Sequence, residues 1–454
     1  MIEQMTLNLV ARARNPRRPL TPSSEFRDPA FMENKSAPVH RWVPWIAGFS
    51  AQFVEDVFHE YLPVKSSHPS LVLDPFAGVG TTLVQAMLHG YHSVGFEINP
   101  YAALVARTKL TAASLDLKAL DALIQQVEKV RAKGNGEPIS ERHRPPGFRS
   151  RIPFFSPKVE SQVLAVLEIL HTISQRDLTD VAKIAFGAVM VQVSNYTYEP
   201  SLGSRPGAGK PLIENADVPA ILAAKLRQIR EDVVWLREHL AGTPSGLRRE
   251  IHCEDFLSPD TQVKNGAVDL VLTSPPYMNN YHYVRNTRPQ LFWLSLVTAS
   301  EELRRLEHRN FGKYWQTVRD ADPIPLHFDH SALVRTLKNL RCTRAALGAY
   351  GGPGWANYVA SYFNDCDRFV AILKGLLHRQ GAAIVVIGNS IIQGIHIPTD
   401  RILGELAEAH GLRLEKIVEL RAKRVGASIT ASSVRRGNRN GTRLYESAVV
   451  LRKQ

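Results

Sequence analysis

Short apolar runs alternate with amphipathic stretches in the first part of the chain after residue 70. Strands are expected at 71–73 and 93–96, because both runs are nearly continuous in apolar or β-branched residues. A Gly-rich turn and the helical pattern TTLVQAMLHG follow the first run. Asn99 and Pro100, an N-cap residue and a first-turn residue, open a helix after the second. This alternation predicts an α/β fold with a mostly parallel sheet.

The pattern then changes twice along the chain. Mostly helical sequence with Pro/Gly-rich loops fills 110–249, which we interpret as a helical insertion. Strand patterns return at 250–253, 268–272 and 382–387, and the chain ends in two runs, 412–420 and 444–451, joined by a long basic loop. These last two runs are expected to form an antiparallel hairpin at the edge of the sheet.

A discontinuous domain organisation follows from this reading. We expect an N-terminal arm at 1–40 and one catalytic domain built from 41–109 and 250–454. The helical insertion 110–249 interrupts that domain, and a second, variable insertion at 290–375 is a candidate target-recognition region.

Composition restricts the class of protein. Of the 454 residues, 44% are hydrophobic and 22% are charged, which is ordinary for a globular chain. No apolar run reaches the length of about 20 residues that a membrane span needs, so no membrane association is expected. The three cysteines are too few for a disulfide framework. With no secretory signal recognised at the start, we expect a cytoplasmic, reduced protein.

Positive charge adds a candidate partner. Lys and Arg number 56 against 43 acidic residues, which gives a net charge of +13. Basic residues concentrate in 129–151 and in 421–454. Such clusters suit a polyanion, because each neutralised phosphate releases counterions. A solvated basic surface explains the same charge without a ligand.

The sequence LVLDPFAGVGTT sets a glycine-rich turn between a strand and a helix. Gly78 and Gly80 let a ligand approach the backbone and the helix N-terminus, although Leu83 replaces the third glycine of a dinucleotide-binding turn. Asp74 ends the first strand, and Glu97 ends the next, where an acid can hold ribose hydroxyls. S-adenosylmethionine has a ribose and positive centres that suit both acids.

The tetrapeptide Ser274-Pro275-Pro276-Tyr277 follows another expected strand, at the sheet edge where ligands bind. The prolines fix the backbone and remove two donors, which leaves an acceptor-rich site with a flat tyrosine face. The Ser274 hydroxyl and the Pro275 carbonyl can bind the two hydrogens of an exocyclic base amine. The amine lone pair then points at a sulfonium methyl, so positioning and fixed dipoles supply most of the rate.

Together, DPFAGVGTT and TSPPY resemble the amino-directed DNA methyltransferases, which modify cytosine N4 or adenine N6. The Ser-Pro-Pro-Tyr form is similar to the cytosine-N4 branch. HRWVPWIAGFSAQFVEDVF resembles the family's N-terminal helix, and AAIVVIGNS its fifth strand. The resemblance implies a Rossmann-like class I methyltransferase sheet and S-adenosylmethionine as the cofactor.

The resemblance also implies site residues. It places the target-base pocket at Ser274, Pro275, Pro276 and Tyr277. Cofactor contacts carry over to Asp74, Phe76, Gly78, Gly80, Glu97 and Asp255. No metal is expected, although His252 to Asp255 superficially look like a ligand cluster, because alternate residues of a strand point to opposite faces.

The expected reaction is therefore methylation of cytosine N4 on a base flipped out of double-stranded DNA. Three alternatives stay open: the adenine-N6 reaction on DNA, methylation of an RNA base, and a catalytically silent cofactor-binding subunit. The recognition sequence, the oligomeric state and any companion restriction or defence protein are left open by the sequence, which carries no evident nuclease motif.

Two further stretches are candidate DNA contacts. The basic loop at 423–443 is the first of them. After the tetrapeptide, Tyr281, Tyr283, Arg285 and Arg288 could stack on a base or bind phosphate. The alternative for this second stretch is a helix entry packed on the core, with Thr287 as N-cap and Pro289 near the first turn.

Overall fold

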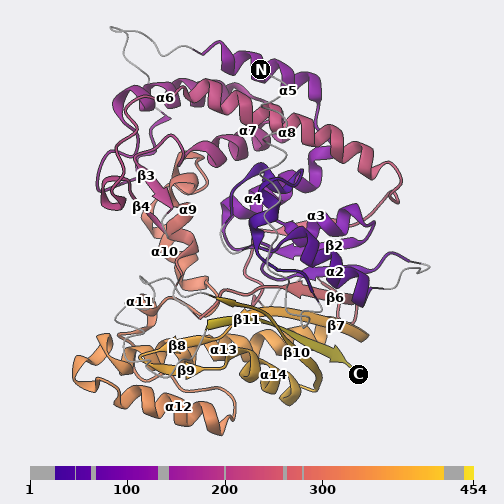
Figure 1. The fold of residues 1–454 in the computed structure, drawn as a ribbon, viewed down its shortest axis with the longest axis vertical. Coiled ribbons are helices and arrows are strands. Elements are labelled where there is room, and N and C mark those ends of the chain that lie inside the picture. Colours follow the sequence, from indigo (N-terminus) through magenta and orange to yellow (C-terminus); the bar gives the residue numbers. More distant parts are fainter. Residues whose placement is uncertain are drawn as a thin grey trace, which may run out of the picture.

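A central seven-stranded sheet organises the molecule. The computed structural model describes residues 26–45, 48–62, 68–130, 143–198, 201–258, 263–278, 281–423 and 444–454 (Figure 1). The sheet comprises β1 (Leu71–Asp74), β2 (His92–Phe96), β5 (Arg249–His252), β6 (Val268–Thr273), β7 (Leu377–Gly388), β10 (Leu412–Lys423) and β11 (Leu444–Lys453).

The strand order is β10-β11-β7-β6-β1-β2-β5. The five neighbouring strands β7, β6, β1, β2 and β5 pair in parallel. β11 is antiparallel to both β7 and β10. The fold is thus the predicted class I methyltransferase sheet, with a closing antiparallel pair at one edge. The chain leaves β1 toward β2 and returns on its other side as β6, so the order reverses between β1 and β6. Ligands of open α/β sheets bind at such a point.

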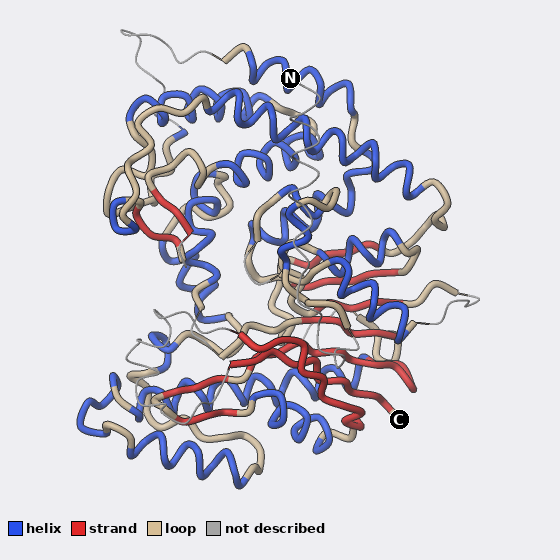
Figure 2. The backbone as a smooth tube through the Cα atoms, in the orientation of Figure 1, coloured by secondary structure: helices blue, strands red, loops and turns tan. Residues whose placement is uncertain are grey.

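Helices cover both faces of this sheet (Figure 2). In β7, Ile384 and Val386 join the core beneath α2 (Ala51–Tyr61), and Val385 and Ile387 join the opposite core. The opposite core includes α13 (Gly352–Leu376) and α14 (Thr399–Ala409). Burial on both faces explains why the sequence of β7 is continuously apolar rather than alternating.

A helical layer lies above the sheet in Figure 1 and shares one hydrophobic core with α3 (Thr81–Leu88). Its helices are α4 (Pro100–Thr111), α5 (Leu117–Glu128), α6 (Pro157–Thr172), α7 (Arg176–Val189) and α8 (Val218–Leu240). A small hairpin, β3 (Tyr196–Tyr198) with β4 (Leu202–Ser204), projects from the layer. Because α4 belongs to this core, the layer is packed continuously onto the catalytic half of the chain.

The segment 290–375 is not uniform. It contains α10 (Ser300–Arg309), α11 (Trp315–Val318), α12 (Ser331–Cys342) and most of α13, after α9 (Tyr283–Trp293). Because α13 has fifteen buried residues and packs in the sheet core, we propose that the variable part ends before Gly352. The small β8 (Ser390–Ile392) and β9 (Ile395–Ile397) pair follows β7.

Several short 3-10 helices connect these elements. They are η1 (Phe31–Lys35), η2 (His40–Trp42), η3 (Ala112–Ser114), η5 (Pro206–Ala208) and η6 (Ala345–Tyr350). Within the described residues, no helix has both the length and the apolar character for a membrane crossing. The same residues hold no group of three or more His, Cys, Asp or Glu arranged for a metal ion.

Candidate functional site

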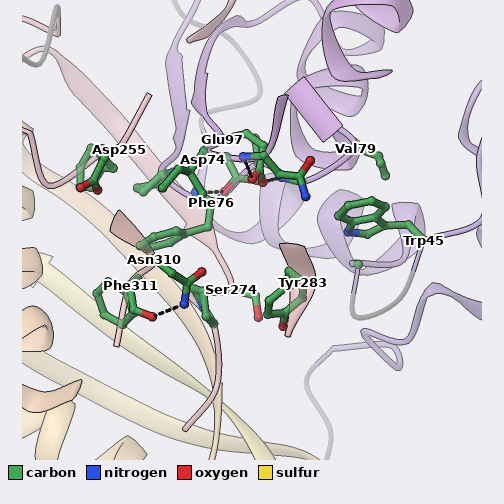
Figure 3. Close-up of a pocket in the computed structure, with 18 of the residues that line it drawn as sticks. Trp45, Asp74, Phe76, Val79, Glu97, Asp255, Ser274, Tyr283, Asn310 and Phe311 are labelled. Atoms are coloured by element: carbon green, nitrogen blue, oxygen red, sulfur yellow. Dashed lines mark hydrogen bonds between the residues drawn. The ribbon is translucent and has the colours of Figure 1, made fainter. Parts of the chain in front are cut away.

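The two loops singled out in the sequence meet at one rim of the sheet. Asp74 ends β1 and Thr273 ends β6, and the Thr273 hydroxyl donates a hydrogen bond to Asp74 Oδ1 at 2.7 Å. A cavity opens at this point and is lined by both the glycine-rich turn and the Ser274 loop (Figure 3). Residues about 200 positions apart in the chain therefore face one space.

Backbone geometry shapes the glycine-rich turn. Gly78 and Gly80 have φ values of 52° and 82°, in the left-handed region that favours glycine. A Cβ on Gly80 would lie 2.9 Å from the Ala106 Cβ of α4, so helix packing also demands glycine there. Beneath the turn, the fully buried Lys109 donates from Nζ to the Val79 carbonyl at 3.0 Å.

Two carboxyls face the turn, the buried Asp74 and the partly buried Glu97. Glu97 accepts the Gly78 N–H on Oε2 at 2.9 Å and the Asn99 N–H on Oε1 at 2.7 Å. Asp74 accepts the Phe76 N–H at 3.1 Å. Burial raises the pKa of Asp74 to about 6 and that of Glu97 to about 7, and the charge of Asp74 adds to the second shift. Each Glu97 oxygen accepts one backbone N–H and keeps a lone pair for a further donor, so this carboxyl can bind hydroxyls or a cation.

Aromatic side chains and two further acids, Glu254 and Asp255, complete the cavity. Phe76 packs edge-on against Phe311 with ring centroids 5.1 Å apart. In Figure 3, Asp255 and Trp45 lie at opposite ends of the cavity. The Leu257 N–H donates a hydrogen bond to Asp255 Oδ1 at 3.0 Å, which orients this carboxylate. Apolar walls with acids at separate points fit S-adenosylmethionine, whose ribose, adenine amine and positive centres need different partners.

The Ser274 tetrapeptide is held from several sides. Ser274 and Pro276 line the cavity, while Pro275 and Tyr277 are not among its lining residues. The Tyr362 hydroxyl of α13 donates to the Pro276 carbonyl at 3.0 Å. This contact fixes one of the carbonyls in the loop.

The Tyr277 ring packs against the end of β7. A Cβ on Gly388 would come within 3.1 Å of the ring, so the end of β7 supports it closely. The Tyr277 hydroxyl also bonds the Ser274 side chain, and burial raises the pKa of Tyr277 well above its ordinary value. The phenol therefore stays neutral.

A second cavity adjoins the first. Trp45 and Tyr283 line both cavities, and the second is also bounded by Tyr101, Tyr198 and Tyr281. Tyr281 and Tyr283, which follow the tetrapeptide, thus share this second cavity with Tyr101 and Tyr198 of the helical layer. A Cβ on Gly78 would lie 3.1 Å from Trp45 Nε1, so this indole packs against the glycine-rich turn.

The alternative of a helix packed on the core is found in this stretch, but its expected N-cap at Thr287 is wrong. α9 already begins at Tyr283, and its N-cap is His282. Thr287 lies in the second turn, where its hydroxyl bonds the Tyr283 carbonyl and accepts from Asn99 Nδ2 at 2.7 Å. Pro289 lies inside the helix.

Some lining residues were not predicted. Trp45 lies in the stretch that resembled the family's N-terminal helix, but its role as a wall could not be read there. Asn310 and Phe311 follow α10, inside the segment expected to vary. Most of the basic loop at 423–443 lies outside the described residues. Its first residue, Lys423, pairs with Leu444 across β10 and β11.

Comparisons with known proteins agree with this geometry. The family model for N6 and N4 methyltransferases, described as DNA methylase, matches residues 23–107. Type II methyltransferase M.BsoBI of Geobacillus stearothermophilus is 23% identical over 434 residues, 88% of this chain and 83% of the relative. Type II methyltransferase M.MvaI of Kocuria varians is 23% identical over 82% of both chains. A solved rRNA methyltransferase, aviRa of Streptomyces viridochromogenes, aligns over 92% of both chains at 11% identity, but its TM-score of 0.28 supports no argument.

Proposed function

Because this chain belongs to the amino-directed DNA methyltransferases and uses S-adenosylmethionine as methyl donor, we propose that it methylates N4 of cytosine in double-stranded DNA. The observation that carries the proposal is the single cavity at the ends of β1 and β6. The acids of the glycine-rich turn line it together with Ser274.

The cofactor supplies an electrophilic methyl group on a sulfonium. Glu97 would accept from the ribose hydroxyls, because each of its oxygens is engaged by one backbone N–H and retains acceptor capacity. Asp255 would accept from the adenine amine at the far end of the cavity. Asp74 would favour the positive charge, and the deprotonated form of each acid does this best.

The Ser274 loop would orient the target amine. The Ser274 oxygen and the Pro275 carbonyl would accept the two hydrogens of this amine. This favours a tetrahedral nitrogen with its lone pair free. Tyr277 would stack on the extruded base, and its ring packs closely against Gly388. Tyr362 holds the Pro276 carbonyl, so the loop is oriented before the base arrives.

The choice of cytosine rests on the first position of the tetrapeptide, Ser274, since adenine enzymes more often carry Asp or Asn there. The relatives are Type II methyltransferases by name. We therefore expect this chain to modify DNA in the cytoplasm beside a separate restriction enzyme, without cutting DNA itself.

Product analysis tests the proposal directly. Purified protein is incubated with methyl-labelled S-adenosylmethionine and unmethylated plasmid DNA or total RNA, and the nucleosides are resolved by mass spectrometry. Label on N4-methylcytosine from DNA is the expected result, and Asp74→Ala should abolish it by weakening cofactor binding. Label on adenine or in RNA alone would overturn the proposal. Cofactor binding without any transfer would indicate a silent subunit.

A further inference from the structure

A second feature near the site carries four arginines and no acid. A groove beside the β3–β4 hairpin is lined by Arg149, Arg151, Arg285 and Arg288, with Ser150 and Ser204 among its polar residues. Arg149 and Arg151 belong to the segment after residue 142, Arg285 and Arg288 to α9. Two parts of the chain far apart in sequence thus contribute positive charge to one concave surface.

Among the described residues, none of the four guanidinium groups has a carboxylate partner. None of them forms an ion pair with a described residue, whereas Arg41, Arg230 and Arg452 are paired with carboxylates. Arg288 is oriented by stacking: its guanidinium lies 5.6 Å from the Phe148 ring centroid and 5.8 Å from that of Phe292.

Arg288 also has an unused donor. Its Nε is buried and has no hydrogen-bond partner among the described residues. Glu307 of α10 acts on it through charge but forms no ion pair with it. A half-buried cation held by aromatic rings with a free donor is arranged to receive an anion.

The groove is tied to the catalytic cavity by α9. Tyr283, at the first position of α9, lines the cofactor cavity. Arg285 and Arg288 follow on the same helix, a rise of roughly 3 and 7.5 Å further along its axis. The hairpin is docked on that helix, since the Leu202 N–H bonds Asn286 Oδ1 at 3.0 Å and the Tyr198 hydroxyl bonds the Asn286 carbonyl at 2.9 Å.

We propose that this groove binds the phosphodiester backbone of the DNA strand that flanks the target nucleotide. The inference rests on the proposed DNA substrate and assigns the task of holding DNA to the helical layer together with α9. Arginine presents a planar fork to phosphate oxygens, so the contacts would position the duplex without reading its sequence. Phosphates close to the flipped nucleotide must lie within a few ångströms of the catalytic rim, where α9 starts.

The test compares charge-matched variants of the whole protein. Arg149→Gln/Arg151→Gln removes two exposed charges from the groove, and Arg285→Gln removes one. Arg335→Gln/Lys338→Gln removes two exposed charges from α12, at the far end of the molecule in Figure 1. Binding to an unmodified 30-base-pair duplex is measured by fluorescence anisotropy at several salt concentrations.

The logarithm of affinity should fall less steeply with the logarithm of salt in the groove variants. Each lost phosphate contact lowers that slope by about 0.9, so we expect about 1.8 for the double variant and 0.9 for Arg285→Gln. Affinity at 0.1 M salt should drop on the order of tenfold per arginine. The α12 variant should match the unaltered protein, and calorimetry should give the same affinity for S-adenosylmethionine in all variants.

Unchanged slopes in the groove variants, or a loss confined to the α12 variant, would overturn the inference. If the unaltered protein still methylates DNA, either of these results leaves the proposed function standing. A wild-type protein that binds S-adenosylmethionine but neither binds nor methylates DNA would remove both proposals together.

Discussion

Tyr277 offers a test at the level of a single ring. Its phenol is neutral and its ring packs against Gly388, so the side chain is suited to stacking rather than to proton transfer. Tyr277→Ala should lower the methylation rate roughly 5- to 150-fold, the equivalent of about 1–3 kcal/mol of base stacking. Tyr277→Phe should keep most of the rate. Steady-state kinetics and calorimetry with S-adenosylmethionine check both variants, and an equal loss of cofactor affinity in Tyr277→Ala would contradict a base-contacting role.

The raised pKa values of Asp74 and Glu97 predict a pH dependence of cofactor binding. Burial raises the pKa of Asp74 to about 6 and that of Glu97 to about 7. Because a cationic ligand binds the deprotonated acids best, affinity for S-adenosylmethionine should rise between about pH 5.5 and pH 8. Calorimetry across this range measures the effect, and Glu97→Gln should flatten the upper part of the curve.

The same shifts have the opposite sign for the stability of the cofactor-free protein. A carboxyl whose pKa is raised on folding binds its proton more tightly in the folded state. That contribution is complete below the unfolded pKa, near 4, and is lost as pH rises through 6 to 7. Urea unfolding without cofactor should therefore show decreasing stability over this window. A free energy of unfolding that increases there would contradict the placement of these acids.

Local sequence patterns predicted the residues that sit next to a turn or a strand end. Asp74, Gly78 and Ser274 are of this kind, because strand ends and glycine turns can be recognised from the local sequence alone. Trp45 and Lys109 are not, since each reaches the glycine-rich turn through tertiary packing. A buried lysine beneath a turn leaves no trace in the spacing of a sequence.

Among the elements, the start of α3 is the most sensitive. Gly80 caps this helix with φ 82°, and a Cβ there would press on Ala106 at 2.9 Å. Gly80→Ala should lower the free energy of unfolding by about 1–3 kcal/mol and weaken cofactor binding. Gly246→Ala is the control: Gly246 has φ 75° and open space within 4 Å of the position a Cβ would take, so the change should cost only about 1 kcal/mol. Equal losses in urea unfolding for the two variants would argue against a packing constraint at Gly80.

Elements with strong patterns were predicted, and elements defined by context were not. The strands and the edge hairpin of β10 and β11 follow from apolar runs, and the structure confirms them. The start of α9 differs from the alternative that placed an N-cap at Thr287, because Pro289 usually marks a first turn but here lies inside the helix. The expected insertion 290–375 includes most of α13, and its end before Gly352 remains our proposal, because periodicity does not distinguish a helix under a sheet from one on the surface of an insertion.

Across the whole molecule, one carboxylate joins the helical layer to the cofactor cavity. Asp232 of α8 is buried and accepts from the Val39 N–H and from Trp42 Nε1, both at 2.9 Å, and from Arg41 at 2.6 Å. Three residues after Trp42, Trp45 forms a wall of the cavity. Asp232 therefore fixes, from the helical layer, the segment that carries Trp45 into the cavity wall.

Removal of this carboxylate should be felt at both places. Asp232→Ala leaves buried donors unpaired and should lower the free energy of unfolding by about 3 kcal/mol. It should also weaken affinity for S-adenosylmethionine. Asp217→Ala, which removes only the N-cap of the same helix, should cost about 1 kcal/mol and spare the cofactor. Urea unfolding and calorimetry distinguish the two, and full cofactor affinity in Asp232→Ala would deny the connection.

How the layer docks was beyond the sequence. Periodicity defines the apolar face of a helix such as α8, but not which neighbour that face meets. The pairing of Asp232 with Arg41, separated by 191 positions, could not be inferred from either stretch alone.

The neighbouring strands β1 and β6 have a consequence for how the protein is made. They pair side by side, yet β1 ends at Asp74 and β6 begins at Val268. At translation rates of about 5–20 residues per second, the ribosome needs roughly 10–40 s to deliver the second strand after the first. During that interval the edge of β1 that later pairs with β6 is unpaired. A nascent chain of this length therefore exposes a strand edge that chaperones can bind.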